Sequence, residues 1–389
     1  MSLWGFKYLR SNRLITLFLM LTLLSMLFSV TAISSLSFYK SLVNYLGEEE
    51  DIVVLYDRNA RTPFSGYVPV HLAERLENIK GVIVSSPEVI APSIVKGEAV
   101  FVRGVLPKKF FELHRIKILN GSIFDQNETK SAIIGKNIAR RLNLKLNDRL
   151  FAFGVLTESY VELQVRGIYA SDSFIDDEIL VPLYVGQWLR GINYGYVSFI
   201  RFKVNKSLIN LSEVFSEVMK EGSEHSSHES RLRVELVMSE AVTNFSNKKV
   251  GAEIASRLMR SYIDRYGLTE ETILILSTAI ILFSSAMIAV ASETTVTQHK
   301  GEIGVLRALG ASKKFLKLDI IIKILTLSLF SSLLGTLLAI IFLSFIQVQE
   351  RLVILSHIMR LQLDLTLIVM SILITPVLVL ISLFKIEIK

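Results

Sequence analysis

Ile324–Ile346 reads ILTLSLFSSLLGTLLAIIFLSFI, 23 residues without a charged side chain. The hydrocarbon core of a bilayer is about 30 Å thick, and about 20 apolar residues in a helix are needed to cross it. A helix is expected because every backbone N–H and C=O group in hydrocarbon must be hydrogen-bonded within its own segment. The stretch therefore predicts a membrane-spanning helix, which we expect to begin in the charged residues before it and to cover residues 315–346.

Three further uncharged runs are long enough to cross a bilayer: Leu14–Leu36, Thr272–Ser292 and Leu365–Phe384. The whole chain of 389 residues is 51% hydrophobic, which is high for a soluble protein. It contains no cysteine, and this excludes disulfide scaffolds and thiolate zinc sites. The sequence predicts a multi-pass α-helical membrane protein with four transmembrane helices, arranged as one before and three after a large α+β extracytoplasmic domain.

The first run is also open to interpretation as a secretory signal peptide. Cations precede it, and Val30-Thr31-Ala32 resembles a cleavage site. Its apolar stretch exceeds the usual length of about 7–15 residues for such a peptide, however. An uncleaved anchor is the preferred interpretation.

The positions of the basic residues predict how the chain is oriented. With four spans, three groups lie on one side of the membrane, and an excess of lysine and arginine marks the cytoplasmic side. We therefore expect the protein to lie in the plasma membrane, with both of its termini in the cytoplasm. Arg351 and Arg360, in the link on the other side, weakly oppose this assignment. The three groups are Lys7, Arg10 and Arg13; His299, Lys300, Arg307, Lys313, Lys314 and Lys317; and Lys385 and Lys389.

The net charge of +7 follows from this topology, so no nucleic-acid partner is predicted. The predicted order of segments is an amphipathic cytoplasmic helix (1–13), a first span (14–36), an extracytoplasmic domain with a helical stalk (37–271), a second span (272–292), a cytoplasmic coupling segment (293–314), a third span (315–346), a short external link (347–364), a fourth span (365–384) and a cytoplasmic tail (385–389).

Short strands mixed with short helices predict small α+β lobes for the extracytoplasmic domain, not a doubly wound sheet. The stretch Ala241–Tyr266 has a helical pattern and predicts a stalk that leads to the second span. Strands are expected at Ile52–Tyr56, Ala99–Val105, Ala132–Gly135, Leu150–Phe153, Val161–Ile168, Ile179–Val181 and Val197–Val204, and shorter helices at Pro69–Ile79, Ile138–Leu144, Val185–Leu189 and Leu208–Met219.

Asn-x-Ser/Thr sequons agree with the predicted sidedness, because all five lie in the segment assigned to the outside. Glycan acceptors belong on translocated surface loops. The alternative is that the sequons arise by chance in a chain rich in asparagine and serine. The candidate glycosylation sites are Asn120, Asn127, Asn205, Asn210 and Asn244.

Catalytic motifs are absent from the sequence. It contains no Walker A pattern, no G-x-S-x-G elbow and no H-E-x-x-H motif, so an enzyme is not predicted. His225 and His228, which have glutamates nearby, form the one metal-like cluster. We favour a solvated loop there, since imidazole ligands need fixed partners of their own. No metal site is therefore predicted.

Two other charged groups have a functional and a structural interpretation. Asp172, Asp176, Asp177 and Glu178 could bind a cation, but without the spacing of a calcium loop a solvated turn is favoured. Asp319 and Lys323 lie four residues apart at the start of the third span. Charges inside a membrane often mark function, yet this spacing predicts a simple ion pair on one helix face.

The segment Gly301–Ser312, GEIGVLRALGAS, lies between the second and third spans. Its pattern predicts a short helix with an apolar face formed by Ile303, Leu306 and either Ala308 or Leu309. Glycine at the end of a helix and serine at the start of the next are the preferred caps. Gly310 is thus expected to end this helix and Ser312 to begin the third span.

This segment resembles the FtsX-like/MacB-like family of ABC transporter permeases, whose motif is close to E-R-x-x-E-I-G-x-x-R-A-x-G-A. Glu302-Ile303-Gly304, Arg307-Ala308 and Gly310-Ala311 match it in order and spacing. Gln298-His299 stands where the family has Glu-Arg. In the third span, Lys323 replaces a common glutamate and Ser331-Ser332 a Gly-Gly pair, while Gly335 matches.

The segment between the first two spans is similar to the MacB-type periplasmic core domain. The similar stretches occur in the right order: Ile79-Lys80-Gly81-Val82, Val102-Arg103-Gly104-Val105, Ile118-Leu119-Asn120-Gly121, Ile134-Gly135-Lys136-Asn137-Ile138-Ala139 and Val165-Arg166-Gly167-Ile168.

The resemblance implies two permease subunits, as a homodimer or a heterodimer in the lipid bilayer, assembled with two ABC-type ATPase subunits. ATP would be bound and hydrolysed by the ATPase partner, and the resemblance implies that this hydrolysis is coupled to motion of the extracytoplasmic domain, which exports or extracts a substrate. No cofactor is expected in this chain. The alternatives are an FtsX-like signalling subunit that regulates a cell-envelope enzyme, or a membrane-anchored sensor or adhesion protein. The substrate and its direction of movement stay open. The residues implied in ATPase coupling are Glu302, Ile303, Gly304, Leu306, Arg307, Ala308 and Gly310.

Overall fold

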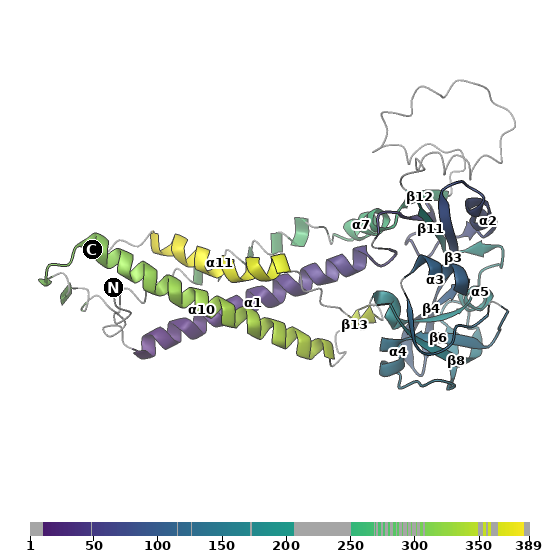
Figure 1. Cartoon of the computed structure of the whole chain (residues 1–389), viewed down its shortest axis with the longest axis horizontal. Coiled ribbons are helices and arrows are strands. Elements are labelled where there is room, and N and C mark those ends of the chain that lie inside the picture. The colour runs from purple at the N-terminus through teal and green to yellow at the C-terminus, as the bar shows by residue number, and fades with distance from the viewer. Residues whose placement is uncertain are drawn as a thin grey trace, which may run out of the picture. The chain divides into compact units, whose positions relative to one another are not determined.

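The computed structural model describes residues 11–47, 49–114, 116–125, 127–171, 173–205, 250–267, 308–348 and 365–384, with 353–354, 357–358 and isolated positions between 269 and 305. The chain forms two compact units (Figure 1). We call residues 1–39, 268–352 and 359–389 the helical unit, and residues 40–267 and 353–358 the sheet unit. The sheet unit thus includes six residues from the link between two long helices.

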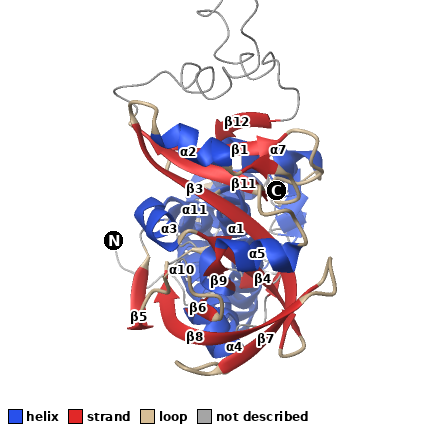
Figure 2. Ribbon diagram, turned by 90° about the vertical axis from the view of Figure 1, so that its right-hand side faces the viewer, coloured by secondary structure: helices blue, strands red, loops and turns tan. Residues whose placement is uncertain are grey.

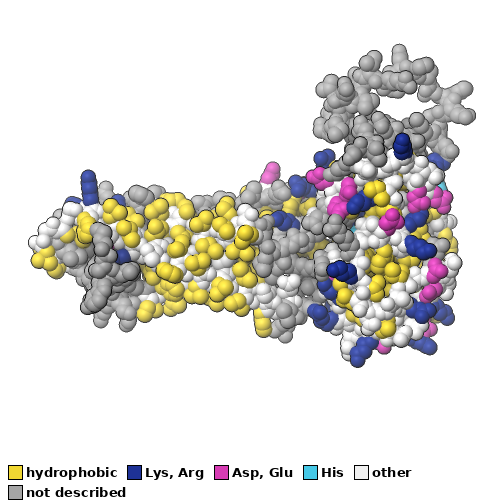
Figure 3. All heavy atoms as spheres, viewed as in Figure 1, with side chains coloured by type: hydrophobic (Ala, Val, Ile, Leu, Met, Phe, Trp, Pro, Cys, Tyr) yellow, Lys and Arg dark blue, Asp and Glu magenta, His cyan; other side chains and the backbone are white. Residues whose placement is uncertain are grey.

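Among the described residues of the helical unit, three helices are long and apolar enough to cross a membrane. They are α1 (Ser11–Val43), α10 (Lys313–Val348) and α11 (Leu365–Phe384), and they confirm the predicted first, third and fourth spans. Figure 3 shows hydrophobic side chains covering their visible surface.

The predicted second span falls where the structure describes isolated positions only. The described positions within residues 272–292 are helical. No fourth helix of membrane length is found among the described residues. The predicted amphipathic helix at residues 1–13 also lies almost wholly outside them, since description begins at residue 11.

Small residues let α1 and α10 cross closely (Figure 1). A Cβ atom added to Gly335 would lie 2.7 Å from the backbone oxygen of Thr22. The hydroxyl groups of Ser29 and Thr336 lie 3.2 Å apart across the same crossing. Without a hydrophobic driving force between helices in lipid, close contact of small residues and interhelical hydrogen bonds hold such a pair. Gly335, which matches the family pattern, thus lies at the point of closest approach described for the two helices.

The charged pair at the start of α10 is also as predicted. Lys323 Nζ donates a hydrogen bond to Asp319 Oδ2 at 2.5 Å, over the i,i+4 spacing of one helix face. The interaction lets both charges lie near apolar segments as a paired unit.

A ten-stranded mixed sheet forms the sheet unit, in the order β12-β1-β11-β3-β4-β9-β6-β8-β5, with β7 pairing with β3 and β8 (Figure 2). The β4–β9 and β6–β8 pairs are parallel and the others antiparallel. The strands are β1 (Ile52–Asp57), β3 (Val82–Val95), β4 (Glu98–Val105), β5 (Lys117–Gly121), β6 (Ser131–Gly135), β7 (Arg149–Gly154), β8 (Tyr160–Ala170), β9 (Glu178–Pro182), β11 (Phe199–Val204) and β12 (Val250–Ile254).

Two short pairs complete the strands. β2 (Val68–Pro69) pairs with β10 (Tyr196–Val197), and β13 (Val353–Ile354) pairs with β14 (His357–Ile358) as an antiparallel hairpin.

Helices cover both faces of the sheet. On one face, α2 (His71–Glu77) and α5 (Leu183–Arg190) bury two apolar clusters that share β3. On the other face lie α3 (Pro107–Leu113) and the 3₁₀ turn η2 (Phe174–Asp177). The other helices among the described residues of the sheet unit are α4 (Lys136–Arg141) and α7 (Ala255–Arg265). The α+β class predicted for this domain is confirmed.

One helix was predicted where the structure has a strand. Within Ala241–Tyr266, residues 241–249 lie outside the described residues, Val250–Ile254 is strand β12 paired with β1, and only α7 is helical. The prediction of a continuous stalk helix is wrong at β12 because five residues are too few to show a strand period. The predicted helix Leu208–Met219 lies outside the described residues.

Candidate functional site

The predicted coupling segment is described in part. Gly301, Gly304, Val305 and Ala308 are helical, whereas Glu302, Ile303, Leu306 and Arg307 lie outside the described residues. Leu309 N donates to Val305 O at 3.1 Å, which closes the last helical turn. The structure therefore bears on the helical form of the segment but not on its predicted contact residues.

The end of this segment is a sharp break between two helices. Gly310 has φ of +95°, a conformation that glycine adopts without steric cost. Two residues later, Ser312 Oγ accepts a hydrogen bond from Phe315 N at 3.3 Å and caps the start of α10. The predicted helix end and cap are confirmed.

Three of the five sequon asparagines are described, and all three are exposed. Asn120 lies on β5, while Asn127 and Asn205 lie outside regular structure. Asn210 and Asn244 fall outside the described residues.

The acidic patch predicted to be a solvated turn is buried instead where the structure describes it, and Asp172 lies outside the described residues. Asp176 and Asp177 in η2 and Glu178 at the start of β9 are fully buried. Asp176 Oδ1 accepts hydrogen bonds from the backbone N–H and the hydroxyl of Ser171, at 2.5 and 2.7 Å. The prediction is wrong because local sequence does not reveal partners that come from elsewhere in the chain. Across the described residues, no cluster of potential metal ligands is found, and His225 and His228 lie outside them.

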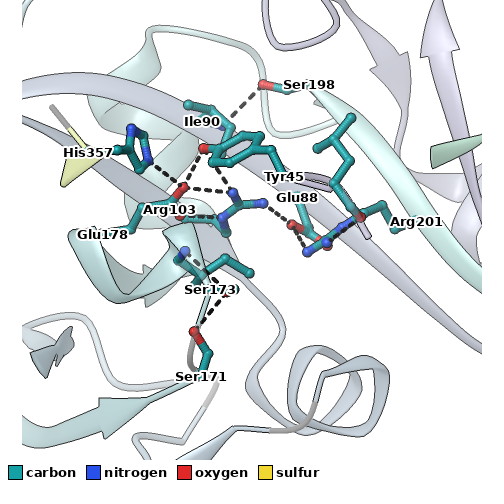
Figure 4. Close-up of polar contacts among 12 residues, drawn as sticks. Tyr45, Glu88, Ile90, Arg103, Ser171, Ser173, Glu178, Ser198, Arg201 and His357 are labelled. Carbon is teal, nitrogen blue, oxygen red and sulfur yellow. Dashed lines mark hydrogen bonds and ion pairs between the residues drawn. The ribbon is translucent and has the colours of Figure 1, made fainter. Parts of the chain in front are cut away.

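Glu178 belongs to a row of alternating charges that crosses four adjacent strands (Figure 4). Arg201 on β11, Glu88 on β3, Arg103 on β4 and Glu178 on β9 are each 0% exposed. We call these four residues the charge ladder. The strand register places them on the same sheet face, the one covered by α3 and η2.

The first half of the ladder joins β11 to β3. Arg201 Nε and Nη2 donate to the two carboxylate oxygens of Glu88 at 2.6 and 2.7 Å. Arg201 Nη1 also donates to the backbone oxygen of Leu46, at 2.8 Å. A bidentate guanidinium–carboxylate pair is among the strongest charge-assisted contacts. The hydrogen bond to Leu46 ties the sheet to the turn that follows α1.

The second half joins β3, β4 and β9. Arg103 Nη1 donates to Glu88 Oε2 at 2.6 Å, and its Nε and Nη2 donate to Glu178 at 2.5 and 2.8 Å. The Tyr45 hydroxyl donates to Glu178 and accepts from Arg103 Nη2 at 3.1 Å. Both carboxylates are thus saturated with donors, which is the condition under which buried charges are tolerated.

The hairpin β13–β14 brings His357 to one end of the ladder. His357 Nε2 lies 3.5 Å from Glu178 Oε1, and the residue is 7% exposed. Three rings surround the imidazole: Phe101 stacks on it at 5.4 Å between centroids, and Tyr45 and Phe174 meet it edge-on at 5.3 Å. We call these three residues the aromatic cage.

Electrostatics inside the ladder are set by the guanidinium groups. Burial raises the pKa of Glu178, but Arg103 outweighs this and lowers it to about 2. The pKa of Tyr45 is raised by burial and by the Glu178 carboxylate, so its hydroxyl stays a donor. Burial, with Arg201 and Arg103 nearby, holds the pKa of His114 well below its usual range and the ring neutral.

Acid is expected to destabilise the sheet unit through Glu178. Its pKa is lower in the folded state than the ordinary 4.5, so its stabilisation is complete above pH 4.5 and is lost as the pH falls towards 2. The loss amounts to roughly 3 kcal/mol of unfolding free energy. Denaturant titration of the full chain, followed by intrinsic tryptophan fluorescence at several pH values, measures it. The variant Glu178→Gln should flatten this dependence, whereas Glu162→Gln, at a 38% exposed carboxylate, should retain it.

The ladder was missed from the sequence although three of its four members left a signal. Glu88, Arg103 and Arg201 interrupt apolar strands, and such charges are rarely buried without a partner. Their pairing depends on register between strands up to 113 residues apart. Charges of opposite sign inside apolar strands would have indicated a buried ion pair, but not which residues form it.

Two family models match the chain. The MacB-like periplasmic core domain matches residues 17–210, and the FtsX-like permease C-terminal matches residues 274–386. No protein with a curated description matches the chain.

Three solved structures similar to this chain each cover less than half of it. The periplasmic region of MacB from Actinobacillus actinomycetemcomitans is 10% identical, over 43% of this chain and 81% of that one, with a TM-score of 0.33. The extracellular domain of the noncanonic ABC-type transporter YknZ from Gram-positive bacteria is 15% identical, over 43% and 90%, with a TM-score of 0.34. A domain of a putative permease protein from Porphyromonas gingivalis is 14% identical, over 44% and 81%, with a TM-score of 0.31.

The two family models follow one another along the chain and together match well over half of it, in the order that the sequence motifs predict. The chain belongs to the FtsX/MacB-like family of ABC permeases.

Proposed function

We propose that this chain is the permease subunit of an ABC transporter, in which a separate ATPase subunit hydrolyses ATP and an extracytoplasmic domain acts on a substrate for export or extraction. The observation that carries this proposal is the presence, in one chain, of a MacB-like core domain followed by an FtsX-like C-terminal domain. Two copies, or this chain and a related one, would assemble with the ATPase. ATP is bound by that partner and not by this chain.

The segment 301–310 is the proposed contact with the ATPase. Its described positions form a helix that ends at Gly310, next to the capped start of α10. Val305 and Leu309 are 62% and 80% exposed there. Exposed apolar side chains at a helix end support a protein partner. We assign the contact to Glu302, Ile303, Gly304, Leu306, Arg307, Ala308 and Gly310.

The topology is proposed with four spans, the second at residues 272–292. The hairpin 353–358 belongs to the same compact unit as residues 40–267, which supports placing the link 347–364 on the same side of the membrane as the 37–271 domain. Segment 293–314 and both termini are then cytoplasmic. The exposed sequons at Asn120, Asn127 and Asn205 are on the proposed outer side.

Substitutions in the proposed contact should weaken partner binding. Leu306→Asp places a charge on the apolar face, and Arg307→Glu reverses a flanking charge. Each is expected to cost about 2 kcal/mol, or about thirtyfold in the Kd for the ATPase, as for a central interface residue. Co-purification of the tagged chain with an ABC-type ATPase from the same cell, and the ATPase rate of the complex, measure the effect.

Arg360→Glu is the matched control, since it makes the same charge reversal in the proposed external link. It should leave co-purification unchanged. Full binding by Leu306→Asp and Arg307→Glu, or labelling of a thiol at position 305 by a membrane-impermeant reagent added outside, would contradict the proposal.

A further inference from the structure

Four apolar side chains are exposed on one face of the sheet, where β7 lies between the end of β3 and β8, at the end of the sheet unit opposite β12 (Figure 2). They are Ile94 on β3, Phe151 and Phe153 on β7, and Tyr160 on β8, and they are between 42% and 63% exposed. Phe153 lies opposite Ile94 in one strand pair and opposite Tyr160 in the other. The ring centroids of Phe153 and Tyr160 are 6.0 Å apart. We call these four residues the apolar patch.

The apolar patch occupies positions where a strand normally carries polar residues. The alternate positions of β7 are buried in the cluster beneath α5, so Phe151 and Phe153 point away from it. The outward face of an antiparallel strand is usually polar. Ile94 lies six residues after Glu88 on β3 and therefore on the face that carries the charge ladder. At the ladder this face is covered by α3 and η2, whereas at the apolar patch it is exposed.

The size of the apolar patch fits a protein partner. A half-exposed aromatic side chain offers about 100 Å² of surface, so the four residues together offer roughly 400 Å². A standard interface buries about 800 Å² on each partner, and a little over half of that area is apolar. Small-molecule sites, in contrast, are concave and enclose most of their ligand. A sheet face of this size favours the surface of another protein.

The charges beside the apolar patch complement themselves. Arg149 on β7 and Glu162 on β8 form an ion pair at 3.3 Å, and their side chains are 76% and 38% exposed. Both adjoin the patch, since Phe151 lies opposite Glu162 and two residues after Arg149. In a contact between identical surfaces about a two-fold axis, a residue that meets a second residue is met by it in turn. Two such surfaces face to face therefore allow Arg149 of each copy to meet Glu162 of the other.

We propose that the apolar patch is the surface through which the extracytoplasmic domains of two copies of this chain meet, with Arg149 of each copy paired with Glu162 of the other. The inference rests on the proposed function, because it locates a contact within an assembly of two permease subunits. It involves the sheet unit and not the ATPase contact at 301–310, so the two proposals can fail separately.

The chain contains no cysteine, so a single introduced thiol reports on the contact. Ile94→Cys places the thiol in the apolar patch and retains the three aromatic rings. The full chain in detergent micelles is treated with a short bis-maleimide, and the crosslinked dimer is quantified on denaturing gels. Leu119→Cys, at a 59% exposed leucine on β5 outside the patch, is the matched control. Ile94→Cys should crosslink about tenfold faster than this control, because contact raises the effective concentration of the two thiols.

Charge reversal separates pairing between copies from pairing within one copy. Arg149→Glu and Glu162→Arg, each on the Ile94→Cys background, bring like charges together in a dimer of identical copies. Each should slow crosslinking about fivefold, the effect of exposed ion pairs made repulsive. When the two variants are co-expressed with different tags, opposite charges face each other again, and the mixed dimer should crosslink at the original rate. Like charges persist within each copy, so only pairing between copies gives this rescue.

Equal crosslinking of Ile94→Cys and Leu119→Cys would overturn the proposal, as would a mixed dimer that crosslinks no faster than the single variants. Crosslinking of Ile94→Cys to a different protein would also refute it and would assign the apolar patch to that partner. Co-purification of the ATPase is measured on the same sample. If the ATPase is recovered without the crosslink, only the patch contact fails, and if the crosslink forms without the ATPase, only the proposed function fails.

Discussion

Arg103→Leu is expected to destabilise the sheet unit by about 3–5 kcal/mol, the cost of removing one partner from a buried ion pair. The substitution leaves the Glu178 carboxylate fully buried without its guanidinium donors, and Glu88 with Arg201 alone. Most single substitutions cost far less, so the loss should separate clearly from background. Denaturant unfolding of the full chain at pH 7, followed by intrinsic tryptophan fluorescence, gives the free energy.

Two controls test whether the unpaired carboxylate causes this loss. Arg149→Leu removes a guanidinium that is 76% exposed and paired with Glu162, and should change stability by at most about 1 kcal/mol. The double variant Arg103→Leu/Glu178→Leu replaces the pair by apolar groups, which is often near neutral, and should recover much of the loss. If the double variant were as unstable as Arg103→Leu, packing and not charge would be responsible.

Gly335→Val should separate α1 from α10 in the helical unit. The new Cβ would lie 2.7 Å from Thr22 O and 3.0 Å from Met26 N, so backbone atoms and not a flexible side chain would have to move. Overpacking of this kind costs about 1–3 kcal/mol and occasionally more, and we expect the upper end. Unfolding of the full chain by SDS, followed by the helical circular dichroism signal, measures the shift.

Ser344→Leu provides the comparison for Gly335→Val, because it adds volume at an exposed position of the same helix. It should leave the unfolding midpoint unchanged. A midpoint for Gly335→Val that equals the wild-type value would show that the two helices do not depend on this crossing.

Features governed by local chemistry could be predicted from the sequence. The spans at α1, α10 and α11 follow from apolar length, and the break at Gly310 and the cap at Ser312 from residue type. Most strands of the sheet unit also lie where apolar runs predict them. Strand β3 was missed although it is central and 14 residues long. Pro87 and Pro92 interrupt its pattern, and proline argues against a central strand.

Features governed by distant pairing could not be predicted. Glu178 reads as part of an acidic turn because Asp176 and Asp177 precede it, and nothing local indicates that Arg103 lies beside it. The hairpin around His357 is equally hidden, since its sequence resembles any link between two spans. The coupling residues Leu306 and Arg307 are a different case. Their role is predicted from the resemblance to the family motif, and only measurements of binding to the ATPase partner can test it.

The charge ladder also selects one register for the pairing of the strands in the sheet. Glu88 lies opposite Phe199 on one side and Val105 on the other, and Arg103 lies opposite Ile90 and Leu180. Slipping β4 by a single residue would turn Arg103 to the opposite face, among the apolar side chains beneath α2 and α5. In such a shifted register, the Arg103 cation would be buried without a partner, and the Glu88 and Glu178 carboxylates would lose its hydrogen bonds. The four strands can therefore pair in one register only.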